Sequence, residues 1–234
     1  MIDLPSLLLV VGTALVDSIN PFSIGVLILI ITYLLGNSYS SKHLALFGSV
    51  YIFSIWLSYL LVGLGLVAIF ANIPTQIMSW VLLGISIFIA IIGALEVKDY
   101  FWYGKGVSLQ PPRNIVDRTH GLANTKTNSF GLIMLGLFVA IAGLPALGSP
   151  LLALSGILRL DFSLSSALLM GLFSLILILP LIIILILAVR KVKISHIARW
   201  KEDSKAMIRL FTGILLIFLS WLLMLSANGT INMG

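Results

Sequence analysis

Six long runs of apolar residues dominate this chain and leave little room for another architecture. Crossing about 30 Å of hydrocarbon takes about 20 helical residues, and each run reaches that length. With 9% charged residues, against about 25% in soluble domains, the chain has too little polar surface to stay in water. We therefore predict six transmembrane helices, over residues 6–35, 43–71, 75–97, 129–158, 163–189 and 207–227.

Two of the six runs, the first and the fourth, are too long for one simple crossing and contain prolines near their middle. The interruptions fall at Asn20-Pro21 and between Pro145 and Pro150. Because proline lacks a backbone donor and its ring clashes with the preceding turn, we predict that both helices are broken at these points. Two ordinary proline kinks are the alternative.

Each interrupted run opens a group of three predicted helices, so the chain divides into two halves. Residues 1–97 form the first three-helix repeat, 98–128 a cytoplasmic linker, 129–227 the second repeat and 228–234 a tail outside the membrane. Three helices per half make the second half enter the membrane from the opposite side. The predicted fold class is therefore all-α, a polytopic membrane protein with two inverted repeats, which is a recurrent plan among transporters.

Positive charge is distributed unevenly over the loops, and this predicts the orientation. Of 14 Lys and Arg residues, only Arg159 falls in an even-numbered loop. Basic residues collect in cytoplasmic loops, so we predict that loops one, three and five are cytoplasmic and both termini outside. The net charge of +6 then indicates contact with anionic lipid and not with nucleic acid. The fifth loop, VRKVKISHIARWKEDSKAMIR at 189–209, is either a short amphipathic helix on the inner leaflet or a charged loop.

Asp17 is the most informative polar residue, because it lies deep in the first apolar run beside the predicted break. A carboxylate at the bilayer centre costs about 2.5–3.5 kcal/mol on insertion scales. Either Asp17 senses a proton or a cation, or Asp17 or Asn20 caps the amide donors of the restarting helix. The residues expected to form the helix breaks or a substrate path are Asp17, Asn20, Pro21, Ser23, Pro145, Gly148, Ser149 and Pro150.

Two further groups of polar residues lie in the second and third apolar runs. Glu96 adjoins Lys98 and Asp99 at the predicted cytoplasmic boundary, and we expect a solvated interfacial cluster there. In the second run, polar residues recur at three- to four-residue spacing and form either a stripe that faces the breaks or ordinary contacts between helices. These residues are Tyr51, Ser54, Ser58 and Tyr59.

The motifs of soluble enzymes are missing from the sequence. There is no Walker A loop, no G-x-G-x-x-G after a strand and no G-x-S-x-G elbow. His43, His120 and His196 lie in loops far apart in the chain, so we expect neither a metal site nor a cofactor. The chain contains no cysteine, which excludes thiol chemistry.

Four stretches resemble a known family of membrane proteins. They are DSINPFSIGVLILIITYLL at 17–35, YIFSIWLSYLLVGLGL at 51–66, LEVKDYFWYGKGVSL at 95–109 and GLPALGSPLLALSGIL at 143–158. They are similar to the CcdA-type cytochrome c biogenesis proteins, which are related to the DsbD transmembrane domain and the LysE-like transporter group. The resemblance implies six helices in two inverted triplets, in the plasma membrane of a prokaryote.

The resemblance also implies a function, the transfer of reducing equivalents from cytoplasmic thioredoxin to an extracytoplasmic thiol protein. The family uses one cysteine after the proline of each broken helix, and these positions hold Phe22 and Ala146 here. Exchange requires thiolate attack on a disulfide, so the chain as written is redox-inactive. The first hypothesis is thus a CcdA-like protein without redox activity. The alternatives are a secondary transporter of a small solute or ion that uses Asp17, and a membrane scaffold that transports nothing.

Overall fold

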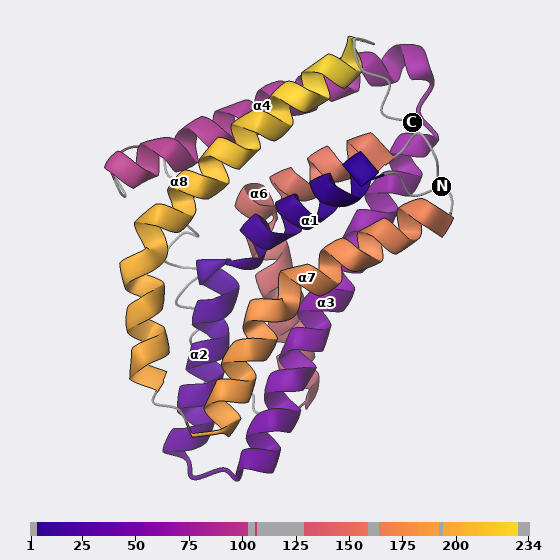
Figure 1. The fold of residues 1–234 in the computed structure, drawn as a ribbon. Coiled ribbons are helices and arrows are strands. Elements are labelled where there is room, and N and C mark those ends of the chain that lie inside the picture. The colour runs from indigo at the N-terminus through magenta and orange to yellow at the C-terminus, as the bar shows by residue number, and fades with distance from the viewer. Residues whose placement is uncertain (1–3, 103–105, 107–128, 159–163, 192–193, 229–234) are drawn as a thin grey trace.

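The described part of the chain is helical apart from short turns and contains no strand. In this computed structural model the described residues are 4–102, 106, 129–158, 164–191 and 194–228. The predicted linker at 98–128 and the tail at 228–234 lie almost entirely outside them, as does Arg159. The helices are α1 Leu4–Ser18, α2 Pro21–Gly36, α3 Ser41–Ala71, α4 Thr75–Phe101, α6 Ser129–Leu158, α7 Leu164–Val189 and α8 Ile194–Ala227 (Figure 1).

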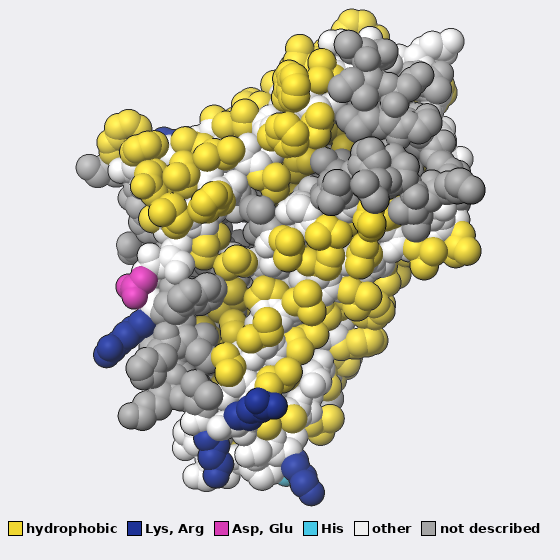
Figure 2. All heavy atoms as spheres, in the orientation of Figure 1, with side chains coloured by type: hydrophobic (Ala, Val, Ile, Leu, Met, Phe, Trp, Pro, Cys, Tyr) yellow, Lys and Arg dark blue, Asp and Glu magenta, His cyan; other side chains and the backbone are white. Residues whose placement is uncertain are grey.

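The described helices have the length and the surface of a membrane-embedded protein. Three shorter helical stretches, at 22–36, 130–141 and 149–158, are also apolar. Large apolar side chains cover much of the visible surface in Figure 2, and Trp80 is 76% exposed. Such a surface is favourable in hydrocarbon and unfavourable in water. Among the described residues, four helices are long and apolar enough to cross a membrane: Ser41–Ala71, Gln76–Phe101, Leu164–Val189 and Ala206–Leu225.

The predicted break in the first apolar run is present. Helix α1 ends at Ser18 and α2 begins at Pro21, which occupies the first turn of the new helix. Between them, Asn20 has an extended backbone and is the N-cap of α2. Proline is well tolerated at this position because its missing N–H would have no partner inside the helix anyway.

The predicted break in the fourth run is wrong. Helix α6 continues without interruption from Ser129 to Leu158, through the whole segment between Pro145 and Pro150. In Figure 1 the ribbon of α6 changes direction along its length, which agrees with the alternative of a proline kink. The local difference is the residue before the proline. Asn20 supplies a capping oxygen before Pro21, whereas Leu144 before Pro145 has no polar side chain that could start a new helix. Ser149 does precede Pro150, but the helix continues through both residues.

Two antiparallel helix pairs organise the bundle. A Cβ added to Gly48 of α3 would meet Leu185 of α7, and one added to Gly63 would meet Met170, so α3 and α7 run in opposite directions. The start of α3 and the end of α7 therefore lie at the same end of the molecule. The start of α1 and the end of α8 lie at the other end (Figure 1).

The second antiparallel pair consists of α4 and α8, which lie side by side across one end of Figure 1. At their crossing a Cβ on Gly93 would lie 2.9 Å from the Gly213 carbonyl oxygen. Small residues at both positions allow the two backbones to approach closely. The fifth-loop sequence is helical from Ile194 onward, as one alternative predicted, but it is continuous with the sixth apolar run in one 34-residue helix.

Candidate functional site

The α1–α2 break is held by a small network of hydrogen bonds around Asn20. The Asn20 Oδ1 atom accepts from the backbone N–H of Phe22 at 2.9 Å and of Ser23 at 3.4 Å. The Asn20 Nδ2 group donates to Ser23 Oγ at 2.8 Å. Both side chains are buried. Of the two capping candidates, Asn20 and Asp17, it is therefore Asn20 that caps α2.

Asp17 has a different environment, although it lies only three residues earlier. Its side chain is 3% exposed, and neither carboxylate oxygen has a hydrogen-bond partner among the described residues. It lies in the last turn of α1, where the carbonyl end of the helix dipole opposes a negative charge. A buried carboxylate without a partner is stable only when it carries a proton or binds a cation. This arrangement supports the proton- or cation-sensing interpretation of Asp17.

The polar residues of the α3 stripe have two different neighbours. Tyr51 and Tyr59 are both buried, and the Tyr51 hydroxyl donates to the backbone carbonyl of Ser23 at 3.1 Å. Tyr59 belongs to the same apolar core as Ala14 of α1, which lies three residues before Asp17. Tyr51 therefore faces the break, whereas Ser54 packs against Gly136 of α6, as in an ordinary contact between helices.

The two serines of the stripe are bonded to their own helix. Ser54 Oγ donates to the Val50 carbonyl at 2.9 Å, and Ser58 Oγ donates to the Ser54 carbonyl at 2.7 Å. Because both hydroxyl protons are used in this way, the two oxygens retain lone pairs that can accept hydrogen bonds.

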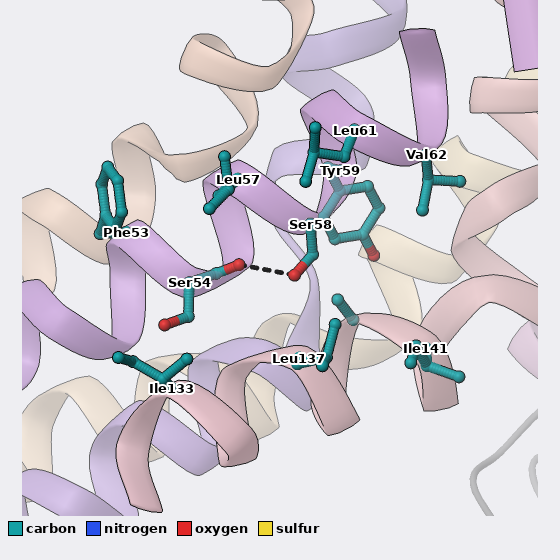
Figure 3. Close-up of a pocket in the computed structure, with 11 residues that line it drawn as sticks. Phe53, Ser54, Leu57, Ser58, Tyr59, Leu61, Val62, Ile133, Leu137 and Ile141 are labelled. Carbon is teal, nitrogen blue, oxygen red and sulfur yellow. Dashed lines mark hydrogen bonds between the residues drawn. The ribbon is translucent and has the colours of Figure 1, made fainter. Parts of the chain in front are cut away.

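A pocket of about 400 Å³ opens between α3 and the first half of α6, beside the stripe. In Figure 3 apolar side chains from α3 and from α6 face each other across it, with Ser54 and Ser58 between them. The two helices touch where a Cβ on Gly136 would lie 2.6 Å from Ser54 Cβ. Tyr59 lines this pocket and belongs to the buried apolar core that also includes Ala14 of α1.

Thr13 also lies near the α1–α2 break, although the sequence alone did not identify it as a candidate site residue. It is buried and lies four residues before Asp17, on the same face of α1. The spacing of four residues was the available signal, because residues i and i+4 share a helix face. A threonine in an apolar helix is common enough that the spacing alone did not select it.

The residues of the second predicted break are described only in part. Ser149 is buried at 1% exposure. The side chains of Pro145, Ala146 and Gly148 lie outside the described residues, so no contact between the two predicted breaks is established. Phe22 stands where the CcdA-type proteins have their first cysteine. It is half-buried and packs against the main apolar core.

The expected solvated cluster at Glu96 is wrong, because these charges are buried. Arg209 of α8 donates from one guanidinium nitrogen to Glu96 at 3.1 Å and to Asp99 at 2.9 Å. Asp99 also forms an ion pair with Lys98 at 2.7 Å. Arg209 was predicted to lie in or beside the fifth loop. The close packing of α8 on α4 brings it onto the two carboxylates and excludes water from them.

No protein-family model, curated protein or solved structure matches this chain. Within the described ranges, no group of three or more His, Asp or Glu residues is arranged to hold a metal ion. The buried, unpartnered carboxylate of Asp17 is therefore the feature from which a function can be inferred.

Proposed function

We propose that this protein is a secondary transporter of a small solute, in which Asp17 is the group that binds the coupling ion. One observation carries the proposal: the Asp17 carboxylate is buried at a helix break, and neither oxygen has a hydrogen-bond partner among the described residues. A purely structural carboxylate in a membrane would be paired or hydrogen-bonded. A carboxylate that must bind and release an ion, in contrast, cannot have a permanent partner within the protein.

The proposed architecture has six transmembrane spans in two inverted repeats, in the plasma membrane of a prokaryote with both termini outside. The antiparallel pairing of α3 with α7 and of α4 with α8 supports it. These are the second and the third helices of each half, and a two-fold axis in the membrane plane pairs equivalent helices in this way. The two halves are not fully equivalent. The first half has a capped break between α1 and α2, whereas α6 in the second half is continuous.

The proposed substrate path leads from the pocket between α3 and α6, past Tyr59, to Asp17. Ser54 and Ser58 offer hydrogen-bond acceptors along this path, and the remaining lining is largely apolar. The proposed coupling ion is a proton, because a single carboxylate provides few of the oxygen ligands that a metal cation requires.

Infrared difference spectroscopy tests the protonation of Asp17 even while the solute is unidentified. Purified protein in vesicles is titrated with acid, and the carbonyl band of a protonated carboxyl is compared between wild type and Asp17→Asn. We expect a band that is present in the wild type and absent in the variant. Vesicles with an internal pH dye then report proton movement when candidate solutes are added. A wild-type solute flux that persists unchanged in Asp17→Asn would remove Asp17 from the mechanism.

The resemblance to CcdA-type proteins bears on the scaffold and not on the chemistry. Without cysteine, neither thioredoxin nor an extracytoplasmic thiol protein can exchange disulfides with this chain. A Phe22→Cys/Ala146→Cys variant tests whether the scaffold is shared. Formation of a disulfide under oxidation, and its reduction by thioredoxin, would support the shared scaffold. Failure to form the bond would argue against the assignment of these two positions.

A further inference from the structure

A second apolar groove lies on another face of α3, between α3 and α7, and has a volume of about 620 Å³. It shares only Phe53 with the pocket beside Tyr59. Its apolar walls include Ile52 and Trp56 from α3 and Ile178 and Ile182 from α7. Arg190, directly after the end of α7, is its one charged lining residue among those described. This feature is called the α3–α7 groove below.

The length of the groove matches the depth of one leaflet. On α3 it extends from Ala45 to Trp56, and on α7 from Leu175 to Val189. At 1.5 Å per residue these stretches are about 16 and 21 Å long. Half of a hydrocarbon core of about 30 Å is about 15 Å. A groove that starts at Arg190 therefore reaches about the middle of the membrane, as an acyl chain does.

Charge is concentrated at the Arg190 end of the groove. Because α3 and α7 are antiparallel, Lys42 at the start of α3 lies at the same end as Arg190 and Lys191. Figure 2 shows Lys and Arg side chains gathered at the lower end of the molecule, below a broad apolar surface. Arg190 and Lys191 are exposed. A guanidinium binds phosphate oxygens through two parallel hydrogen bonds, which an ammonium cannot do.

We propose that the α3–α7 groove binds an anionic phospholipid, with its phosphate on Arg190 and one acyl chain along the apolar walls. The chemistry of the groove matches this ligand at both ends, with a cation at the lipid-water boundary and an apolar channel one leaflet deep. Anionic lipids are enriched in the cytoplasmic leaflet, where the basic end of the molecule is proposed to lie. The binding makes no use of Asp17, so it can fail while the proposed transport function stands.

Native mass spectrometry of the full chain, released from micelles with phosphatidylglycerol or phosphatidylcholine, tests the headgroup. The matched variants are Arg190→Gln and Arg199→Gln, since Arg199 is also an exposed arginine but does not line the groove. We expect wild type and Arg199→Gln to retain more phosphatidylglycerol than phosphatidylcholine. In Arg190→Gln the ratio of bound phosphatidylglycerol to bound phosphatidylcholine should fall about five-fold. Equal retention of the two lipids by wild type, or an equal loss in both variants, overturns the proposal.

The fluorescence of Trp56 provides an independent measurement of whether an acyl chain lies in the groove. Phosphatidylglycerol with brominated acyl chains quenches indole fluorescence on contact, and the difference between wild type and Trp56→Phe isolates the Trp56 signal. We expect strong quenching of this signal, reduced at least two-fold by Ala45→Phe, which narrows the groove near its basic end. Quenching that is the same with brominated phosphatidylcholine overturns the proposal. So does a dimer without lipid preference, because a second copy of the chain would then occupy the groove.

Discussion

Two places in this protein bury carboxylates, and they are built in opposite ways. Between α4 and α8, Glu96 and Asp99 share the guanidinium of Arg209 at 3.1 and 2.9 Å. At the α1–α2 break, Asp17 has no hydrogen-bond partner among the described residues. Both places exclude water, so the difference lies in partners and not in depth.

The comparison separates a structural role from a functional one. A buried pair is costly to break, because removing one partner leaves an uncompensated charge. A carboxylate without a partner loses nothing of that kind when it is neutralised. The α4–α8 cluster is therefore expected to be sensitive to mutation in stability, whereas Asp17 is expected to be sensitive in function only.

Removal of Arg209 is expected to have the largest effect on stability. Arg209→Met leaves Glu96 and Asp99 buried beside each other, and we expect a loss of about 3–5 kcal/mol in the free energy of unfolding. Thermal unfolding in detergent, followed by circular dichroism, measures it. Adding Glu96→Gln and Asp99→Asn to the variant should recover most of the loss. A single variant as stable as wild type would show that the cluster is solvated after all.

The glycine crossing beside the cluster gives the second largest effect. In Gly213→Ala the new methyl would lie 2.8 Å from both the Gly93 carbonyl oxygen and the Val97 nitrogen, so the helices must separate. We expect a loss of about 1–3 kcal/mol, as for other overpacked sites. Gly84→Ala is the matched control on α4, because nothing lies within 4 Å of its added Cβ. If both variants unfold at the same temperature, close backbone contact does not hold this pair together.

Loss of the cap at the break is expected to be milder. Asn20→Ala removes the acceptor for the Phe22 and Ser23 amides and should cost about 0.5–2 kcal/mol. Asn72→Ala, at an exposed site with one local hydrogen bond, is the control and should change stability little. Hydrogen exchange at the start of α2 localises the effect. Unchanged protection there would mean that Pro21 alone starts the helix.

Asp17→Asn is expected to change stability least, by about 1 kcal/mol or less in either direction, since no hydrogen bond is lost and no charge needs to be neutralised. The same unfolding measurement tests it against Arg209→Met. A loss above about 2 kcal/mol would reveal a hidden partner, and Asp17 would then resemble the α4–α8 cluster.

Much of the fold follows from apolar run length and proline position. These patterns predicted an all-helical chain, the break at Asn20-Pro21 and the approximate extents of the helices. They failed between Pro145 and Pro150, because proline permits either a break or a bend, and a polar residue precedes a proline in both runs. They also failed within 189–209, where the charged sequence was separated from the sixth apolar run although a single helix extends from Ile194 to Ala227.

The candidate site was predictable in its residues but not in its contacts. A carboxylate within an apolar run is recognisable from the sequence as a candidate functional residue, and an Asn before a proline as a candidate N-cap. Whether Asp17 is paired depends on side chains from other helices, and no local pattern reports their absence. For the same reason the burial of Glu96 could not be inferred, since Arg209 lies 113 residues away in the chain.

The sequence by itself determined that the chain is helical and apolar, where its first helix breaks, and that thiol exchange is closed to it, because these depend on residue type and local spacing. Only the tertiary structure decided which buried charges are paired and where α3 leaves a pocket and a groove. Pairing and cavities arise where distant helices meet, and glycines such as Gly93 and Gly213 set how closely they approach.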